Sequence, residues 1–165
     1  MKAMELSRCD KPLIGMIHLF PLPGSYRYHS RGIRTIVAAA LLDLEALEEG
    51  GADGAIVENL QDAPFGKFAP RETITAMTVI VQEMIRVAHI PIGVNVLRND
   101  GLGALAIAMA TGAAFVRINV FCGIAFTDQG PIEGEARALL ELRERLACPV
   151  RILSRGRWLH RRNLP

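Results

Sequence analysis

Two ionisable side chains stand where apolar runs of this sequence end. Glu58 follows the run 55–57, and His18 follows the run 12–17. Carboxylates and imidazoles are common general acids and bases, so we identify Glu58 and His18 as the candidate catalytic pair. Structural alternatives exist for both residues. His18 can be a hydrogen-bonded histidine at a strand end, and an ion pair with Arg117 can keep Glu58 charged and inert.

Eight further polar side chains lie near the ends of apolar runs and are candidates for binding a substrate. Arg117 and Asn119 stand two apart in the run 114–120, so on a strand their side chains share one face. Amide groups such as that of Asn95 can hydrogen-bond a polyol or a carboxylate. The full set is Asn59, Asp62, Asn95, Arg98, Asn99, Asp100, Arg117 and Asn119.

Two of these candidates also fit local structural roles. Asp62 precedes Ala63-Pro64, and aspartate in that position shapes turns. Asp100 precedes a helical pattern and is a suitable N-cap. The glycines at 101 and 103 do not form a dinucleotide-binding fingerprint, because its third glycine is missing.

The elements that must position these side chains alternate regularly. Apolar runs predict strands over 12–17, 55–57, 91–97, 114–120 and 149–153, and helical spacing predicts helices over 33–49, 72–88, 102–110 and 133–146. Continuous apolar strands are typical of parallel sheets. We therefore predict an α/β fold of repeated βα units. A closed eight-stranded barrel needs roughly 200 residues or more, so the 165 residues leave an open doubly wound sheet and half of a barrel as alternatives.

Ordered motifs in this chain resemble those of the BtpA/SgcQ family. They are KPLIGMIHL at 11–19, PLPG at 21–24, EALEEGG at 45–51, DGAIVEN at 53–59, DAPF at 62–65, NVLRND at 95–100, RINV at 117–120 and DQG at 128–130. The resemblance implies that residues 1–153 form the N-terminal half of a TIM-type barrel, similar to the ribulose-phosphate-binding barrels. It also implies a poorly defined activity. One branch of the family is linked to photosystem I biogenesis in cyanobacteria, and the SgcQ-like branch lies among sugar-metabolism genes.

The sequence departs from the family pattern at three places. Phe20 replaces a usual proline, and the segment 121–126, which we interpret as a loop, is unusually apolar. The segment 128–130 is expected to cap the fourth helix, with Pro131 in its first turn. The pattern stops before 154–165, an arginine-rich stretch that we interpret as an aberrant or disordered tail of a truncated barrel. Five of the 19 basic residues, and no acid, lie from Arg151 onward.

Composition narrows the classes of partner. The three widely spaced cysteines suit a reducing compartment, and no run is long enough to span a membrane, so we expect a cytoplasmic protein. Peripheral association with a membrane, such as the thylakoid, stays open. Arginine-rich tails can bind nucleic acids or acidic surfaces, but no specific nucleic acid is predicted. His18, Glu58 and Asp62 include possible metal ligands, but no local spacing supports a metal site, and the cofactor is unknown.

Two functions follow from these observations. The first is an enzyme that acts on a small polar or phosphorylated metabolite through Glu58 and His18. The second is a non-catalytic assembly or stability factor, as in the photosystem branch. A half-barrel also leaves its first and last strands as open edges, so we expect self-association.

Overall fold

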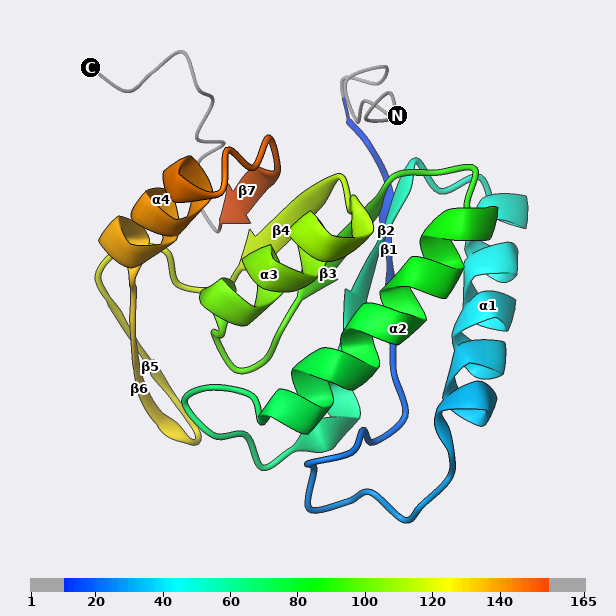
Figure 1. Ribbon diagram of the computed structural model, residues 1–165, viewed down its shortest axis with the longest axis horizontal. Coiled ribbons are helices and arrows are strands. Elements are labelled where there is room, and N and C mark those ends of the chain that lie inside the picture. The colour runs from blue at the N-terminus through cyan, green and yellow to red at the C-terminus, as the bar shows by residue number, and fades with distance from the viewer. Residues whose placement is uncertain (1–10, 155–165) are drawn as a thin grey trace.

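The computed structural model describes residues 11–154, which form one five-stranded parallel sheet with helices packed on it (Figure 1). The sheet order is β1-β2-β3-β4-β7. Its strands are β1 (Ile14–His18), β2 (Gly54–Glu58), β3 (Ile92–Asn95), β4 (Phe115–Ile118) and β7 (Arg151–Ser154). The helices are α1 (Ile33–Glu49), α2 (Arg71–Val87), α3 (Gly101–Thr111) and α4 (Ala136–Arg145), with a short 3₁₀ helix η2 (Leu60–Asp62).

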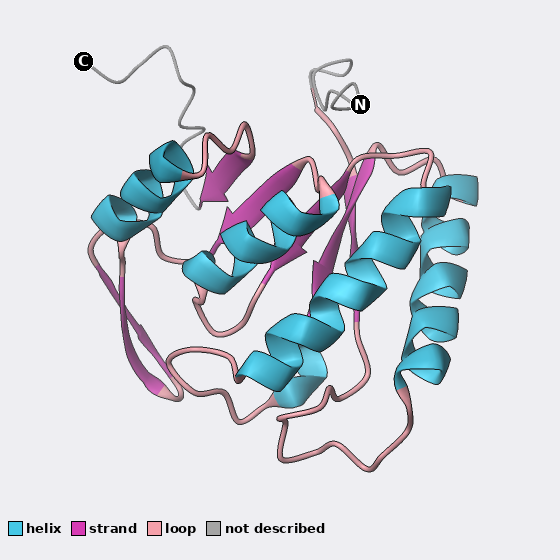
Figure 2. Cartoon of the chain, viewed as in Figure 1, coloured by secondary structure: helices cyan, strands magenta, loops and turns pink. Residues whose placement is uncertain are grey.

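The strands pair in sequence order, which confirms the predicted βα repeat. β2 and β3 lie inside the sheet, and every residue of both is buried. This explains their continuous apolar character. The helices cover one face of the sheet, as Figure 2 shows, and bury an apolar core that includes Ile36, Met77, Ile80 and Ile107.

The opposite face of the sheet has its own small apolar cluster. Ile56 and Phe115 are buried there, with Ile14, Met16 and Leu153 packed against them. These residues alternate along their strands with the residues that face the helices. This is the face that points to the axis of a barrel. Within residues 11–154 the sheet is not closed, and its order places β1 and β7 at its two edges.

The segment after β4 differs from the predicted loop and helix start. Residues 124–127 and 130–133 form an antiparallel hairpin, β5 (Ile124–Thr127) and β6 (Gly130–Glu133). The expectation that 128–130 caps α4 is therefore wrong: Asp128 and Gln129 form the hairpin turn, Gly130 has a φ of 99°, and Pro131 lies in β6. The helix begins only at Ala136, because β6 takes up the residues before it.

Candidate functional site

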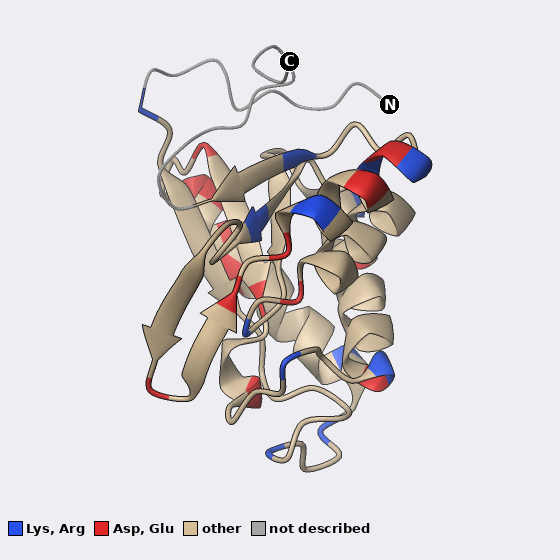
Figure 3. Ribbon diagram, turned by 90° about the vertical axis from the view of Figure 1, so that its left-hand side faces the viewer, with Lys and Arg blue, Asp and Glu red and all other residues tan. Residues whose placement is uncertain are grey.

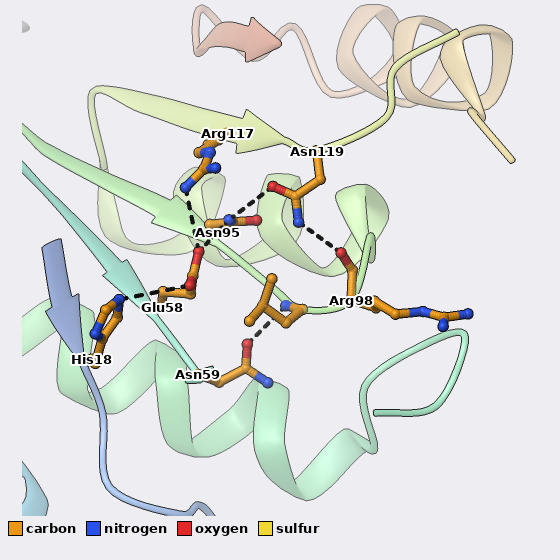
Figure 4. Close-up of polar contacts among 8 residues, drawn as sticks. His18, Glu58, Asn59, Asn95, Arg98, Arg117 and Asn119 are labelled. Carbon is orange, nitrogen blue, oxygen red and sulfur yellow. Dashed lines mark hydrogen bonds and ion pairs between the residues drawn. The ribbon is translucent and has the colours of Figure 1, made fainter. Parts of the chain in front are cut away.

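The register of the sheet brings the candidate catalytic residues together. His18 pairs with Glu58, and Glu58 pairs with Asn95. On β4, Phe115 pairs with Gly93, and Arg117 and Asn95 lie two residues beyond this pair on the same face. Paired residues of neighbouring parallel strands point to the same face, so these side chains gather on the open face, at the carboxyl edge of the sheet (Figure 4).

Glu58 is the centre of this group. Its side chain is only 7% exposed, His18 Nε2 lies 3.8 Å from Oε1, and Arg117 Nη1 lies 3.6 Å from Oε2. The Asn95 amide also donates a hydrogen bond to Oε2. His18 and Arg117 are themselves 42% and 44% exposed. The buried carboxylate therefore has compensating partners, and two of those partners reach solvent.

Asn119 extends the polar contacts towards the loop after β3. Its Oδ1 accepts a hydrogen bond of 3.3 Å from the Asn95 amide. Its own amide donates to the backbone carbonyl of Arg98 at 2.8 Å. A continuous line of amide groups thus connects Glu58 with the β3–α3 loop.

Arg98 lies next to this line, but its side chain points away from Glu58 in Figure 4. Its guanidinium nitrogens reach Thr127 Oγ1 at 3.3 Å and the Pro131 carbonyl at 3.5 Å. Both acceptors belong to the β5–β6 hairpin. The structure therefore places the Arg98 side chain at the hairpin and not beside the carboxylate.

Asn59 and Asn99 each hydrogen-bond the backbone of a neighbouring loop. Asn59 Oδ1 accepts from the Leu97 N–H at 2.7 Å. Asn99 bonds Val120 twice, through the carbonyl and the N–H, each at 2.9 Å. These two side chains fix the loops around the site.

Asp62 is a buried loop carboxylate that joins two βα loops. It accepts hydrogen bonds from the Leu22 N–H at 2.8 Å and from the Asn59 amide at 3.0 Å. Burial raises its pKa, and the bonds from Leu22, Asn59 and Ser25 oppose that effect. These two contacts give Asp62 a structural position between the loops, and neither of them is with the backbone of the turn at Ala63-Pro64.

Asp100 caps α3, as its position before the helix indicated. Its Oδ1 accepts from the Gly103 N–H at 2.8 Å, and its Oδ2 accepts from the Ala69 N–H at 3.0 Å. The second bond ties the β2–α2 loop to α3. Neither Asp62 nor Asp100 is among the groups that the structure brings to Glu58.

The hairpin is the part of this edge that the sequence reasoning missed. Gln129 Oε1 accepts from the Phe65 N–H at 3.0 Å, and Lys67 Nζ lies 3.2 Å from Glu135 Oε1. The Gln129 contact holds the hairpin to the β2–α2 loop, and the Lys67 ion pair holds the residue before α4 to the same loop. The sequence feature that indicates the hairpin is the turn at 128–129, which is followed by a glycine and lies between the four-residue segments 124–127 and 130–133.

Two further features bear on the chemistry. Within residues 11–154, no three His, Cys, Asp or Glu side chains converge to hold a metal ion; His18 and Glu58 approach each other without Asp62. A cavity of about 530 Å³ lies at the opposite end of the sheet, beside Ile85, Met109 and Cys148. Its lining is mostly apolar, in contrast to the polar side chains around Glu58.

A family model described as "BtpA family" matches residues 9–163. The chain belongs to the BtpA family. Among its relatives, an uncharacterised protein of Thermococcus kodakarensis is 47% identical over 144 residues, which is 87% of this chain and 55% of that protein. The photosystem I biogenesis protein BtpA of Synechocystis is 43% identical, over 93% of this chain and 54% of its own length. The putative sgc region protein SgcQ of Escherichia coli is 35% identical, over 76% of this chain and 47% of its own length.

This BtpA-family chain spans about half the length of the curated relatives it matches. Its fold is similar to that of dihydropteroate synthase from Xanthomonas albilineans, with a TM-score of 0.55 and 16% identity over 89% of this chain and 44% of the synthase. That enzyme is a TIM barrel, so the similarity supports the predicted half of a TIM-type barrel. Between residues 11 and 154, none of the helices has the length and hydropathy that crossing a membrane requires.

Proposed function

We propose that this BtpA-family chain carries the acid–base part of an enzyme site for a small polar metabolite. Glu58 acts as the general base, and His18 exchanges the proton with solvent. The observation that carries the proposal is the buried Glu58 carboxylate with His18 and Arg117 on its two oxygens. It lies at the carboxyl ends of parallel strands, where enzymes with the (βα) barrel place their catalytic groups.

The two oxygens of Glu58 have different surroundings. Oε2 takes the hydrogen bond from Asn95 and faces Arg117. Oε1 faces His18 at 3.8 Å and is the oxygen with room to accept a proton from a substrate. His18 is partly exposed and ends β1 beside it, which suits a group that passes the proton on.

A second function has its own support. The Synechocystis relative is named as a photosystem I biogenesis protein, so this chain is alternatively a non-catalytic assembly or stability factor. In that case the Glu58 contacts serve only to hold neighbouring strand ends together. The two functions predict different effects of removing the Glu58 carboxylate: an enzyme loses its activity, and an assembly factor keeps its binding to partners.

Glu58→Gln separates the two proposals. The purified protein is incubated with a small-molecule extract, and compounds that disappear or appear are measured by mass spectrometry. For an enzyme, we expect at least one conversion by the natural protein that falls by about 10²-fold or more in E58Q, which is the usual contribution of a general base. Glu45→Gln, an exposed substitution on α1, is the matched control and should leave that conversion unchanged.

The opposite result supports the assembly role. If no conversion depends on Glu58, while E58Q and the natural protein pull down the same partners with the same yield, the enzymatic proposal fails. Melting curves of all three proteins check that the substitutions preserve the fold.

A further inference from the structure

We infer that the Glu58 site binds a ligand with an anionic group, a phosphate or a carboxylate, and that Arg117 holds this group. The inference rests on the proposed function, because it names the class of ligand for the same site. It begins with the geometry of one ion pair. Arg117 Nη1 and Glu58 Oε2 are 3.6 Å apart, which is longer than the 2.7–3.2 Å of an N–H···O hydrogen bond.

The long contact leaves the donors of Arg117 available. A guanidinium has five N–H donors, arranged as a fork that matches carboxylate and phosphate oxygens. Among residues 11–154, the ion pair with Glu58 is the polar side-chain contact of Arg117. Its side chain is 44% exposed on the open face of the sheet. Charge therefore attracts Arg117 to the carboxylate, while its hydrogen-bonding fork still faces the site.

The loop that follows His18 supplies a second, independent observation. The β1–α1 loop, residues 19–32, contains Arg27 and Arg31 and no aspartate or glutamate, and Arg34 follows in the first turn of α1. All three arginines are exposed, and within the described part of the chain no carboxylate lies within 4.0 Å of any of them. Arg31 packs over the Phe20 ring at 4.4 Å.

This loop makes the β1 side of the carboxyl edge of the sheet positively charged, whereas acids are exposed on the hairpin side. Blue segments mark Lys and Arg in the loops at the bottom of Figure 3. Exposed acids at the same edge include Asp128 and Glu133 of the hairpin, beyond β4. A cationic surface beside a site raises the local concentration of anions and speeds their association. The basic β1–α1 loop thus fits the same ligand class as Arg117.

The position of Arg117 also limits how far the anionic group of the ligand can lie from the proton that Glu58 removes. The group lies next to Glu58, so the proton that Glu58 removes belongs to an atom close to the phosphate or carboxylate. The negative charge of Glu58 opposes such a ligand, and Arg117 offsets that repulsion. Removing the Glu58 charge should therefore leave anion binding intact or tighten it.

Binding of inorganic phosphate and of acetate, each titrated at constant ionic strength, tests the inference. The readout is the NMR shift of side-chain and backbone amides around β4. We expect saturable binding of at least one anion, and the stronger of the two identifies the group. Arg117→Gln should weaken it at least tenfold, and Arg117→Lys, which keeps the charge without the fork, should be intermediate. Arg86→Gln, on α2 beside Glu83, is the control and should bind as the natural protein does.

Two results would overturn the inference: no saturable binding of either anion, or equal binding by R117Q and the natural protein. The steering role of the loop has its own test, since R27Q/R31Q should bind more slowly at low salt and equally fast at high salt. The proposed function is tested separately by E58Q. If E58Q keeps every conversion while R117Q still loses anion binding, acid–base catalysis fails and the anion site stands.

Discussion

Gly93 and Phe115 are register partners on β3 and β4, and the Phe115 ring occupies the space where a side chain on residue 93 would begin. Phe115 is fully buried on the open face, in the cluster with Ile56. Phe115 lies two residues before Arg117 on the same face of β4. Its ring is therefore part of the apolar layer next to the polar site. The glycine is required by this close approach.

Gly93→Ala should therefore destabilise the fold by about 2 kcal/mol or more, as expected for an overpacked core. The free energy of unfolding is measured by urea denaturation. G93A/F115L tests the cause, because the smaller side chain gives the new methyl group room. The double variant should be more stable than the sum of the two single changes predicts. Strict additivity would show that Phe115 is not the reason for the glycine.

The sheet could be predicted from the sequence because its strands are buried. Continuous apolar runs such as 91–97 have few alternatives to a parallel sheet between helices. The β5–β6 hairpin could not be recognised in the same way. Ile124 and Phe126 are 62% and 87% exposed, so no burial pattern marks this strand, and its turn residues equally suit a helix cap.

The site could be predicted in part for a similar reason. The two-residue period of a strand places Arg117 and Asn119 on one face, and strand ends gather at one edge, which brings Arg117 to Glu58. Asn59, Asp62 and Asn99 each bond a backbone group of another loop. Such contacts depend on loop paths, which local sequence does not determine.

Asp100→Ala should lower stability by about 0.5–2 kcal/mol, the usual range for losing an N-cap. The loss should lie in the upper part of this range, because the Ala69 N–H also loses its acceptor. Chemical denaturation measures the change, and Asp43→Ala, an exposed position on α1, is the control. Hydrogen exchange gives the local check: the Gly103 and Ala69 amides should lose protection together. Unchanged protection of Ala69 would contradict the bridging role of Asp100.

The open edges of the sheet predict self-association. Within residues 11–154, β1 pairs only with β2 and β7 pairs only with β4, so each has an unpaired edge. The sedimentation coefficient should therefore rise with protein concentration. Met16→Lys places a charge on the open face of the edge strand β1 and should reduce the association. Leu42→Lys, at an exposed position on α1, is the control and should leave the association unchanged. A monomer coefficient at all concentrations would contradict the prediction.

The buried Asp62 carboxylate predicts an unusual dependence of stability on pH. Burial raises its pKa above the ordinary value of 3.8, so the folded state favours the protonated form more than the unfolded state does. Its contribution to stability is thus complete below about pH 3.8 and is lost as the pH rises through the raised pKa of the folded protein. This direction is opposite to that of a carboxylate in an ion pair.

Asp62→Asn removes this titration. The free energy of unfolding of the natural protein minus that of D62N should fall as the pH rises from 3 towards neutrality, and then become constant. Denaturation curves at several pH values measure the difference. Asp43→Asn, which removes one exposed carboxylate from α1, reports the effect of the change in net charge alone. A difference that grows with pH would mean that the hydrogen bonds from Leu22 and Asn59 outweigh burial, and that Asp62 stabilises the two loops as an ionised acceptor.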